Sequence, residues 1–559
     1  MSHEVPCERS RISLVVGAVL LTANLSGCGG DGSSTPLSSN SGSGTGTTSY
    51  SIGGTISGLT GAGLALNGGA AGTASPQANA ASFTLPTALA AGAKYAVSVT
   101  TQPAGQDCQV SNGTGTVGSA NVTSVQVGCV SGQWTWVGGS KTANASAVYG
   151  TQGTPAATNI PGPRIEAATW IDPSGNLWLF GGWQIEGAVE VELNDLWEYN
   201  PSTGQWTWMS GSNASGASGV YGTVGTPAAS NVPGARRAGA SWTDAMGNLW
   251  LFGGYGIDSG GNTGALNDLW KYSPSIGQWT WAGGSSTVNA AGVYGTQGSA
   301  APANVPSARE ESVAWTDASG NFFMFGGYST VPAPGGVLND LWKYDLSTSE
   351  WTWIAGSNTL NASGVYGTKG TAVASNIPGA RAQAVAWIDS TGNFWLFGGV
   401  GYDSAGISEA LNDLWKYSPG STQWTWVSGS NTAGTPGVYG TLGVAASANG
   451  PGPLQGPVTW SDTAGNLWLF GNAGASPNNL WKFSTSAGQW TWMGGVAQVG
   501  ANSGVYGTLG VAAATNEPGA RSGALSWTDS AGHFWLFGGA GYDSAGNQGS
   551  LNDLWKYAP

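Results

Sequence analysis

The sequence predicts an all-β protein in which a small, disulfide-linked β-sandwich precedes a ring of four-stranded antiparallel sheets. Three observations predict this fold class. A long unit recurs from residue 131 onward, and each unit holds four short segments separated by turn signals. The third observation is the composition, with 95 Gly and 30 Trp among 559 residues and 8% charged residues, against about 25% in an ordinary domain.

The charge balance limits the possible partners. The formal net charge is −13 and the sequence pI is about 4.4. Binding to phosphate groups needs a basic face, so we expect no nucleic-acid partner and no binding to anionic lipid.

Residues 1–27 are predicted to be a signal peptide. Arg9 and Arg11 precede the apolar run 12–21. This run is shorter than the roughly 20 residues that a membrane-spanning helix needs, but it fits the apolar region of a signal peptide.

The segment 25–28, Leu-Ser-Gly-Cys, resembles the bacterial lipobox, in which the cysteine is lipidated. We therefore expect lipid attachment at Cys28; a generic signal peptide with a chance cysteine is the alternative. Residues 28–48 are rich in Gly, Ser and Thr and predict a flexible tether. Together these segments predict an exported lipoprotein of the bacterial outer membrane or cell surface, which contacts the membrane through its lipid alone.

Residues 49–130 predict a small β domain that serves as a stalk. The segment contains no Trp and reads as short strands separated by Gly-rich turns. Once Cys28 carries lipid, Cys108 and Cys129 remain to pair, and an exported compartment permits the disulfide. It would close a loop of about 20 residues and contribute about 3 kcal/mol. We expect an immunoglobulin-like β-sandwich.

Residues 131–559 are built from repeats that share the tripeptide Trp-Thr-Trp. Consecutive copies are spaced by 72, 73, 72, 73 and 66 residues. The copies begin at Trp134, Trp206, Trp279, Trp351, Trp424 and Trp490.

Each repeat predicts one four-stranded antiparallel sheet. In the first, a strand ending at Trp170 is followed by an Asp-x-x-Gly turn, the aromatic segment 176–182, the segment 194–199 and Trp-Thr-Trp at 206–208. We interpret the recurring tryptophans as packing residues between stacked sheets; an aromatic platform for sugar binding is the alternative.

Six such sheets around an axis form a β-propeller. The chain ends just after 552–557, where another Trp-Thr-Trp would be due. We therefore expect residues 134–136 to supply the outer strand of the sixth sheet and to close the ring.

The double glycines and the tyrosine seven positions before Trp-Thr-Trp resemble kelch repeats of the galactose-oxidase-like propeller superfamily. The resemblance covers residues 131–559, and it implies a six-bladed propeller. The fifth repeat departs from the pattern. The glycine pairs are Gly181-Gly182, Gly253-Gly254, Gly326-Gly327, Gly398-Gly399 and Gly538-Gly539, and the tyrosines are Tyr199, Tyr272, Tyr344 and Tyr417.

Arg and Asp recur together in five of the six repeats. The arginine opens the first strand and the aspartate opens the third, while the fifth repeat has Leu454 and Asn479 instead. We predict a structural salt bridge across the glycine pair in each of the five; an arginine ring for an anionic ligand is the alternative. The pairs are Arg164 with Asp195, Arg236 with Asp268, Arg309 with Asp340, Arg381 with Asp413, and Arg521 with Asp553.

Residues that break the repeat are the better functional candidates. The positions directly after the arginine differ in every repeat, and we expect them at the mouth of the central channel, beside the long connections that carry Val-Tyr-Gly-Thr. An ordinary solvated channel entrance is the alternative. The candidate ligand-binding residues are Glu166, Arg237, Glu310, Glu311 and Gln383.

Several chemistries are excluded by composition. Galactose oxidase holds copper with two histidines and two tyrosines, one of them linked to a cysteine, whereas residues 131–559 contain no Cys and one His, His533. The same shortage argues against ordinary metal sites and against a Ser-His-Asp triad, so we expect no catalytic residue, no metal and no cofactor.

Three functions remain open. The first is a monomeric, surface-anchored binding or adhesion propeller that recognises glycan or protein through its long-loop face. The second is a carboxylate-based carbohydrate enzyme resembling N-acetylneuraminate epimerase, in which Glu166 with Glu310 or Glu311 supplies acid and base. The third is a structural envelope protein.

Overall fold

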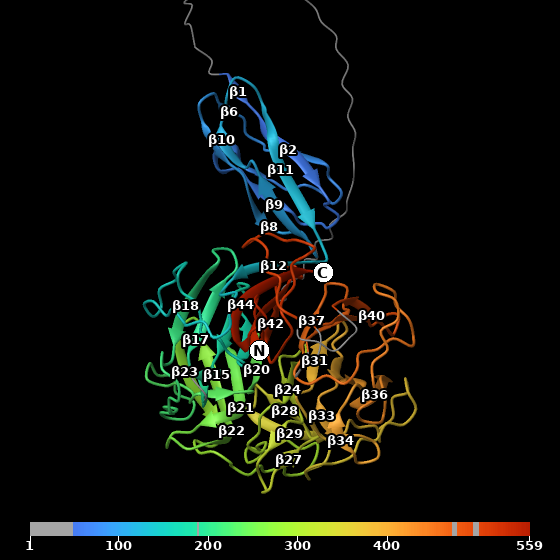
Figure 1. The fold of residues 1–559 in the computed structure, drawn as a ribbon. Helices are drawn as coiled ribbons and strands as arrows, with labels where there is room; N and C mark the ends of the chain where they lie inside the picture. Colours follow the sequence, from blue (N-terminus) through green and yellow to red (C-terminus); the bar gives the residue numbers. More distant parts are fainter. Residues whose placement is uncertain (1–47, 187–188, 472–477, 496–501) are drawn as a thin grey trace, which may run out of the picture. The chain divides into compact units, whose positions relative to one another are not determined.

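The computed structural model describes residues 48–186, 189–471, 478–495 and 502–559, and Figure 1 shows its ribbon. Over these residues the protein is all-β, with one short 3₁₀ helix, η1 (Gly69–Ala71). The predicted lipid-attachment residue Cys28 and the signal and tether segments up to residue 47 lie outside the described residues. In the described part, no helix is long and apolar enough to cross a membrane.

Residues 49–130 form several small sheets around one apolar core, which includes Ile52, Leu66 and Val125. The strands are β1 (Ser49–Tyr50), β2 (Ile52–Ser57), β3 (Ala65–Asn67), β4 (Thr73–Ala74), β5 (Ser82–Thr84), β6 (Leu89–Ala90), β7 (Lys94–Ala96), β8 (Ser98–Thr101), β9 (Asp107–Ser111), β10 (Thr114–Thr116) and β11 (Val122–Val130). The longest strand, β11, pairs in parallel with β2 and antiparallel with β9.

The predicted disulfide between Cys108 and Cys129 is present. It joins directly paired residues of the neighbouring strands β9 and β11. In antibody domains the corresponding bond links two facing sheets, so this disulfide differs from the immunoglobulin pattern.

The remaining residues form six sheets of four principal strands, which we number one to six in chain order. Sheet one is β13 (Ala168–Ile171), β14 (Leu177–Phe180), β17 (Leu196–Asn200) and β18 (Gln205–Ser210); sheet two is β20 (Ala240–Thr243), β21 (Leu249–Ile257), β22 (Thr263–Ser273) and β23 (Gln278–Gly283); sheet three is β24 (Val313–Thr316), β25 (Phe322–Phe325), β28 (Leu341–Asp345) and β29 (Glu350–Ala355). Sheet four is β31 (Val385–Ile388), β32 (Phe394–Phe397), β35 (Leu414–Ser418) and β36 (Gln423–Ser428); sheet five is β37 (Val458–Ser461), β38 (Leu467–Phe470), β39 (Leu480–Ser484) and β40 (Gln489–Gly494); sheet six is β42 (Leu525–Thr528), β43 (Phe534–Tyr542), β44 (Gln548–Ala558) and β12 (Gln133–Gly138).

Short additional strands lie near the ends of the first, second and third principal strands. They are β15 (Trp183–Glu186), β16 (Val189–Glu192), β19 (Arg236–Arg237), β26 (Tyr328–Ser329), β27 (Gly336–Val337), β30 (Arg381–Ala382), β33 (Val400–Tyr402), β34 (Ser408–Ala410) and β41 (Arg521–Ser522).

The Asp-x-x-Gly tetrad forms the tight turn between the first two strands of each sheet. In sheet one, Asp172 Oδ1 accepts hydrogen bonds from the amides of Ser174 and Asn176, at 2.9 and 3.0 Å. The indole of Trp178 donates to the other carboxylate oxygen at 2.9 Å. The aspartate thus fixes both the turn and the first aromatic residue of the second strand, as expected of a side chain that bonds its own backbone.

The first strands of the six sheets contact one another in a closed series, from β13 through β20, β24, β31, β37 and β42 back to β13. The strand β12 pairs antiparallel with β44, with Trp134 opposite Tyr557 and Trp136 opposite Trp555. The predicted pairing of the earliest tryptophans with the C-terminal strand is therefore present.

The tryptophans pack between consecutive sheets. Trp178 of sheet one shares a buried cluster with Trp270 and Trp279 of sheet two. In sheet six, where β12 pairs with the C-terminal strand β44, the ring of Trp134 lies 5.4 Å from that of Phe470 in sheet five. Large flat side chains fill the space between sheets, which agrees with the packing interpretation of the tryptophan content.

The glycine pairs have a reason that the sequence did not reveal. Gly181 and Gly182 adopt positive φ angles of 66° and 89°. A Cβ atom on Gly181 would meet the carbonyl oxygens of Arg236 and Leu193 at 2.6 and 2.8 Å. Glycine is needed because the backbone is left-handed and lies against the backbone of the next sheet; room for the salt bridge is not the main cause.

The long connections before the first strands do more than rim one face, which corrects the expectation. In sheet one, Gly153 donates a backbone hydrogen bond to Trp208, and Asn159 donates its side-chain amide to the carbonyl of Trp206 at 3.0 Å. Each connection runs along the outer strand of its sheet and covers an otherwise unpaired edge.

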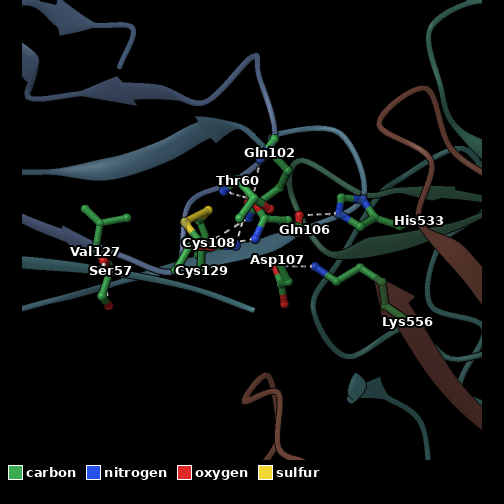
Figure 2. Close-up of a disulfide and its surroundings, with 12 residues drawn as sticks. Ser57, Thr60, Gln102, Gln106, Asp107, Cys108, Val127, Cys129, His533 and Lys556 are labelled. Atoms are coloured by element: carbon green, nitrogen blue, oxygen red, sulfur yellow. Dashed lines mark hydrogen bonds and ion pairs between the residues drawn. A yellow bond between two sulfur atoms is a disulfide. The ribbon is translucent and has the colours of Figure 1, made fainter. Parts of the chain in front are cut away.

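Polar contacts join residues 49–130 to sheet six, as Figure 2 shows. Lys556 of β44 forms a 2.8 Å ion pair with Asp107, one residue before the disulfide. His533 is buried, with Nε2 2.7 Å from the carbonyl oxygen of Gln106 and Nδ1 2.9 Å from Asp529. The single histidine of this region therefore has a structural role.

Candidate functional site

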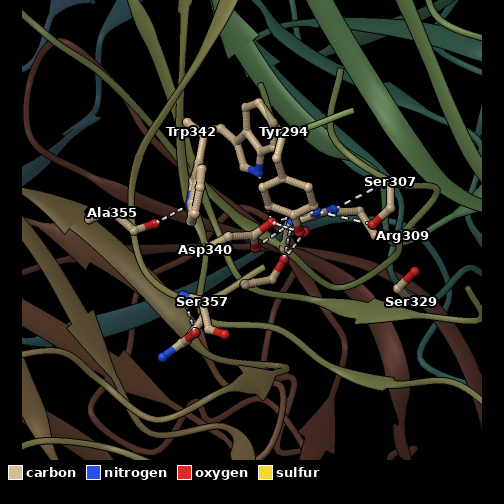
Figure 3. Close-up of polar contacts among 12 residues, drawn as sticks. Tyr294, Ser307, Arg309, Ser329, Asp340, Trp342, Ala355 and Ser357 are labelled. Atoms are coloured by element: carbon tan, nitrogen blue, oxygen red, sulfur yellow. Dashed lines mark hydrogen bonds and ion pairs between the residues drawn. The ribbon is translucent and has the colours of Figure 1, made fainter. Parts of the chain in front are cut away.

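The five predicted Arg–Asp pairs are all present and buried. Arg309 donates from both terminal nitrogens to Asp340, at 2.7 Å each, and also to the carbonyl of Gly326 (Figure 3). The other four pairs have the same bidentate form, with closest N–O distances of 2.6 to 2.9 Å. The side chain of every arginine and aspartate in these pairs is at most 1% exposed, so none of them is open to a ligand.

Two further side chains complete each pair. Tyr294 and the indole of Trp342 both donate to Asp340 Oδ2, at 2.6 and 2.7 Å (Figure 3). Burial raises the pKa of this tyrosine, and the neighbouring carboxylate adds to the rise. Sequence reasoning noticed the recurring Val-Tyr-Gly-Thr but missed that its tyrosine reaches the aspartate. The whole group is a structural network.

The fifth sheet shows the neutral version of this network. Asn479 stands at the aspartate position and donates to the hydroxyl of Tyr439 at 2.7 Å. Both charges are replaced together, because one of them alone would be buried without a partner.

Six residues, one from each sheet, form a circle just before the first strands. Each has a left-handed backbone, with φ between 53° and 59°. Five links around this circle are backbone hydrogen bonds, such as Ala238 to Glu166 at 2.8 Å and Gly523 to Gly456 at 3.1 Å. The circle, which we call the neck, consists of Glu166, Ala238, Glu311, Gln383, Gly456 and Gly523.

A cavity of about 210 Å³ opens at the neck. Glu166, Glu311 and Gln383 line it, together with small residues that follow the neck in all six sheets. The Gln383 amide donates to Glu311 Oε1 at 2.8 Å. Three of the five candidate ligand residues therefore line one cavity.

Arg237 and Glu310 lie just before the neck. Arg237 Nε is 3.9 Å from Glu310, and its Nη1 is 3.3 and 3.6 Å from Glu190 and Glu192. Two aromatic rings flank the guanidinium, those of Trp183 at 5.4 Å and Tyr255 at 5.0 Å from the ring centroids. The arginine is thus held by carboxylates and by cation–π contacts.

The carboxylates at this mouth have raised pKa values. Burial, followed by the charge of Glu311, raises the pKa of Glu310 to about 7. Burial, followed by the charge of Glu166, raises the pKa of Glu311 to about 7. Burial also raises the pKa of Glu166, against the lowering effect of Arg237. Glu310 and Glu311 therefore change protonation near neutral pH, the range useful for proton transfer.

All five predicted ligand residues thus gather at one place. Sequence reasoning missed Trp183, Tyr255, Glu190 and Glu192, which complete the set. One signal was available, because Trp183 is the tryptophan that fits no repeat position. It begins β15, and its indole donates to Glu166 at 3.3 Å. We call these nine residues the mouth cluster.

The mouth cluster combines carboxylates, a guanidinium, an amide and two aromatic rings. Within the described residues, no group of three or more His, Cys, Asp or Glu side chains is placed to hold a metal ion. Carboxylates, an amide and aromatic rings match sugar hydroxyl groups and the apolar faces of sugar rings.

Comparison with known proteins gives a local likeness. No family model matches the chain. N-acetylneuraminate epimerases from Shigella flexneri serotype 5b (strain 8401) and from Shigella flexneri are each 44% identical to it over 57 residues. That segment is 10% of this chain and spans 15% of the length of these curated relatives.

Proposed function

We propose that the protein recognises a saccharide at the mouth of the channel formed by its six sheets. The observation that carries the proposal is the convergence of the unrepeated polar residues, Glu166, Arg237, Glu310, Glu311 and Gln383, beside a cavity. The repeated Arg–Asp charges are paired inside the sheets, whereas Glu166, Glu311 and Gln383 line the cavity, and Arg237 and Glu310 lie beside it. The cavity is smaller than the roughly 300 Å³ at which drug-sized pockets begin, so it suits one sugar unit.

The mouth cluster offers a sugar both kinds of contact that it needs. The half-buried ring of Trp183 can pack against the C–H face of a pyranose. Glu166 and Glu311 accept hydrogen bonds, and Gln383 both donates and accepts them. The Arg237 guanidinium is fixed in place, so little ordering is required on binding.

A glycan array with the full chain, followed by calorimetric titration of the best ligands, tests this function. Arg237→Gln and Glu311→Gln should each weaken binding about tenfold or more, because each removes a charge-assisted contact or the residue that positions one. Lys369→Gln is the matched control, since Lys369 lies on an outer connection and stacks on Trp426. Binding unchanged in both mouth variants would contradict the proposal.

Catalysis by carboxylates is the second candidate. It is favoured by the pKa values of about 7 for Glu310 and Glu311 and by the local likeness to N-acetylneuraminate epimerases. NMR spectra of array ligands incubated with the protein in D₂O would reveal turnover as new anomeric signals or as exchange of a carbon-bound proton. Spectra that stay unchanged while binding persists would leave recognition without chemistry.

We further propose that the six sheets are the blades of a kelch-type propeller. Support comes from the closed series of contacts among the first strands and from the pairing of β12 with β44. We propose that residues 49–130 are a β-sandwich stalk of immunoglobulin-like type that departs from the antibody pattern in carrying its disulfide within one sheet. The N-terminal sequence supports lipid attachment at Cys28 and a place on the bacterial outer membrane or cell surface. We propose further that the propeller acts as a monomer.

A further inference from the structure

We infer that the mouth cluster selects a saccharide that carries a positive charge, an amino sugar with a free ammonium group, over neutral and acidic saccharides. The inference deepens the proposed function and rests on it. It follows from the charges at the mouth and from how each of them is already used.

Negative charge dominates the mouth. Five carboxylates belong to the mouth cluster, and in the described part of the chain their ion pairs are all made with Arg237. The carboxylates are Glu166, Glu190, Glu192, Glu310 and Glu311.

Arg237 is already engaged by carboxylates of the mouth cluster. Its Nη1 faces Glu190 and Glu192, its Nε faces Glu310, and the guanidinium lies against two aromatic rings. An acidic sugar would place its own negative charge among these carboxylates. Like charges at such separations repel strongly where water is partly excluded.

Glu166 and Glu311, in contrast, keep acceptor capacity. Glu166 accepts a hydrogen bond from Trp183, and Glu311 accepts one from Gln383. An ionised carboxylate offers about four lone-pair sites, so both retain sites on the cavity wall. An ammonium group has three donors and no acceptor, which makes it the complementary group.

The protonation of Glu310 and Glu311 supports the same ligand. Because Glu310 and Glu311 have pKa values of about 7, the mouth holds protons that partly neutralise it near neutral pH. When an ammonium group binds, these glutamates can release their protons, and the positive charge of the ammonium then neutralises the carboxylates in their place. A neutral acetamide in the same place would bring one donor and no charge.

Calorimetric titration at pH 7 with two chitin-derived tetrasaccharides and with N-acetylneuraminic acid tests the inference on the full chain. The two tetrasaccharides share one backbone, and they differ in bearing free amines or N-acetyl groups. We expect the free-amine form to bind about tenfold or more tightly than the acetylated form, with the acidic sugar weakest. The preference should shrink as salt rises from 0.05 to about 0.5 M, because salt screens exposed charges.

Two variants and one control locate the effect. Glu311→Gln and Glu166→Gln should each reduce the preference for the amine to about threefold or less, while Glu409→Gln should keep it. Glu409 is an exposed glutamate of β34, away from the mouth cluster. Two mouth variants are used so that misfolding of one, seen by circular dichroism, does not decide the outcome.

The results separate this inference from the proposed function. Equal or tighter binding of the acetylated tetrasaccharide, lost in Arg237→Gln, would overturn the charge selection and keep saccharide recognition. If both glutamate variants keep the preference for the amine, the selection arises outside the mouth cluster and the inference is overturned. If neither these ligands nor any array saccharide binds, both proposals fail.

Discussion

The charges inside the sheets and the charges at the channel mouth use the same residue types for different ends. Inside the sheets, Arg309 and Asp340 meet in a bidentate pair, and a tyrosine, a tryptophan, two carbonyls and a serine hydroxyl bond to the same two side chains. At the mouth, Arg237 is shared among three glutamates at 3.3 to 3.9 Å, and two other glutamates face a cavity. The repeated charges are satisfied internally, and the unrepeated ones are not.

The repeat keeps its structural charges constant and varies the side chains at the neck. The Arg–Asp network recurs because it fixes the same strand ends in sheets one to four and in sheet six. Sheet five has neutral residues in place of both charges. The neck has the same backbone in all six sheets but different side chains. A fixed backbone with free choice of side chain is what a binding site needs.

The largest expected effect concerns the buried pairs. Asp340→Ala should lower the free energy of unfolding by about 3 to 5 kcal/mol, because Arg309 is then left buried without its counter-charge. Urea unfolding followed by tryptophan fluorescence measures this. Asn479→Ala, at the same position of sheet five, is the matched control and should cost about 1 kcal/mol. Equal losses in the two variants would remove the distinction between charged and neutral sheets.

Removal of a single hydroxyl sharpens the comparison within the network. Tyr294→Phe should cost about 1.5 to 3 kcal/mol, since the hydroxyl bonds a buried carboxylate. Tyr439→Phe removes a bond to the neutral Asn479 and should cost about 0.5 to 1.5 kcal/mol. Chemical denaturation of both variants decides the point, and a larger loss for Tyr439→Phe would be unexplained by the network.

The mouth should make stability fall as pH rises. Burial raises the pKa of Glu310 and Glu311 to about 7, above the ordinary 4.5, so the folded protein binds more protons than the unfolded chain between these pH values. Stability contributed by this proton uptake is greatest below pH 4.5 and is lost as pH rises through about 7. At pH 8, the free energy of unfolding of Glu310→Gln should therefore exceed that of the parent by about 1 to 2 kcal/mol. At pH 5 the two free energies should be nearly equal. Urea unfolding at both pH values measures them.

Glu409→Gln provides the reference for that titration, because it removes an exposed glutamate outside the mouth. Its difference from the parent should not change between pH 5 and pH 8. A parent protein whose stability rises steadily from pH 5 to pH 8 would show that the mouth glutamates ionise in the ordinary range.

The smallest effect on stability is expected for Arg237. Arg237→Gln should change the free energy of unfolding by about 1 kcal/mol or less, since its ion pairs are partly exposed and its cation–π contacts are modest. The same variant should lose saccharide binding. A stability loss as large as that of Asp340→Ala would assign Arg237 to the structural group.

Much of this architecture was readable because it repeats. The spacing of Trp-Thr-Trp indicated the sheets and the pairing of residues 134–136 with the last strand. The joint replacement of Arg and Asp by Leu454 and Asn479 in the fifth repeat indicated the salt bridges. The left-handed neck was not predictable, because residues as different as Glu166, Ala238 and Gln383 adopt it. Its cause is the hydrogen-bonded circle, which no single repeat encodes.

The rest of the site escaped prediction for a similar reason. Glu190 and Glu192 reach the mouth from the stretch between the second and third strands of sheet one, and Tyr255 from the far end of the long strand β21; these parts differ in length and sequence from repeat to repeat. The covering of the outer strands by the long connections also depends on contacts across about 50 residues. Neither arrangement follows from local pattern.

A crystal structure of the full chain with its tightest saccharide from the array tests the central claim most directly. The account predicts a sugar ring bound at the neck, in contact with Glu311 and Gln383 and packed against Trp183. A sugar bound instead along the outer strands, with the mouth cluster unchanged from the free protein, would contradict it.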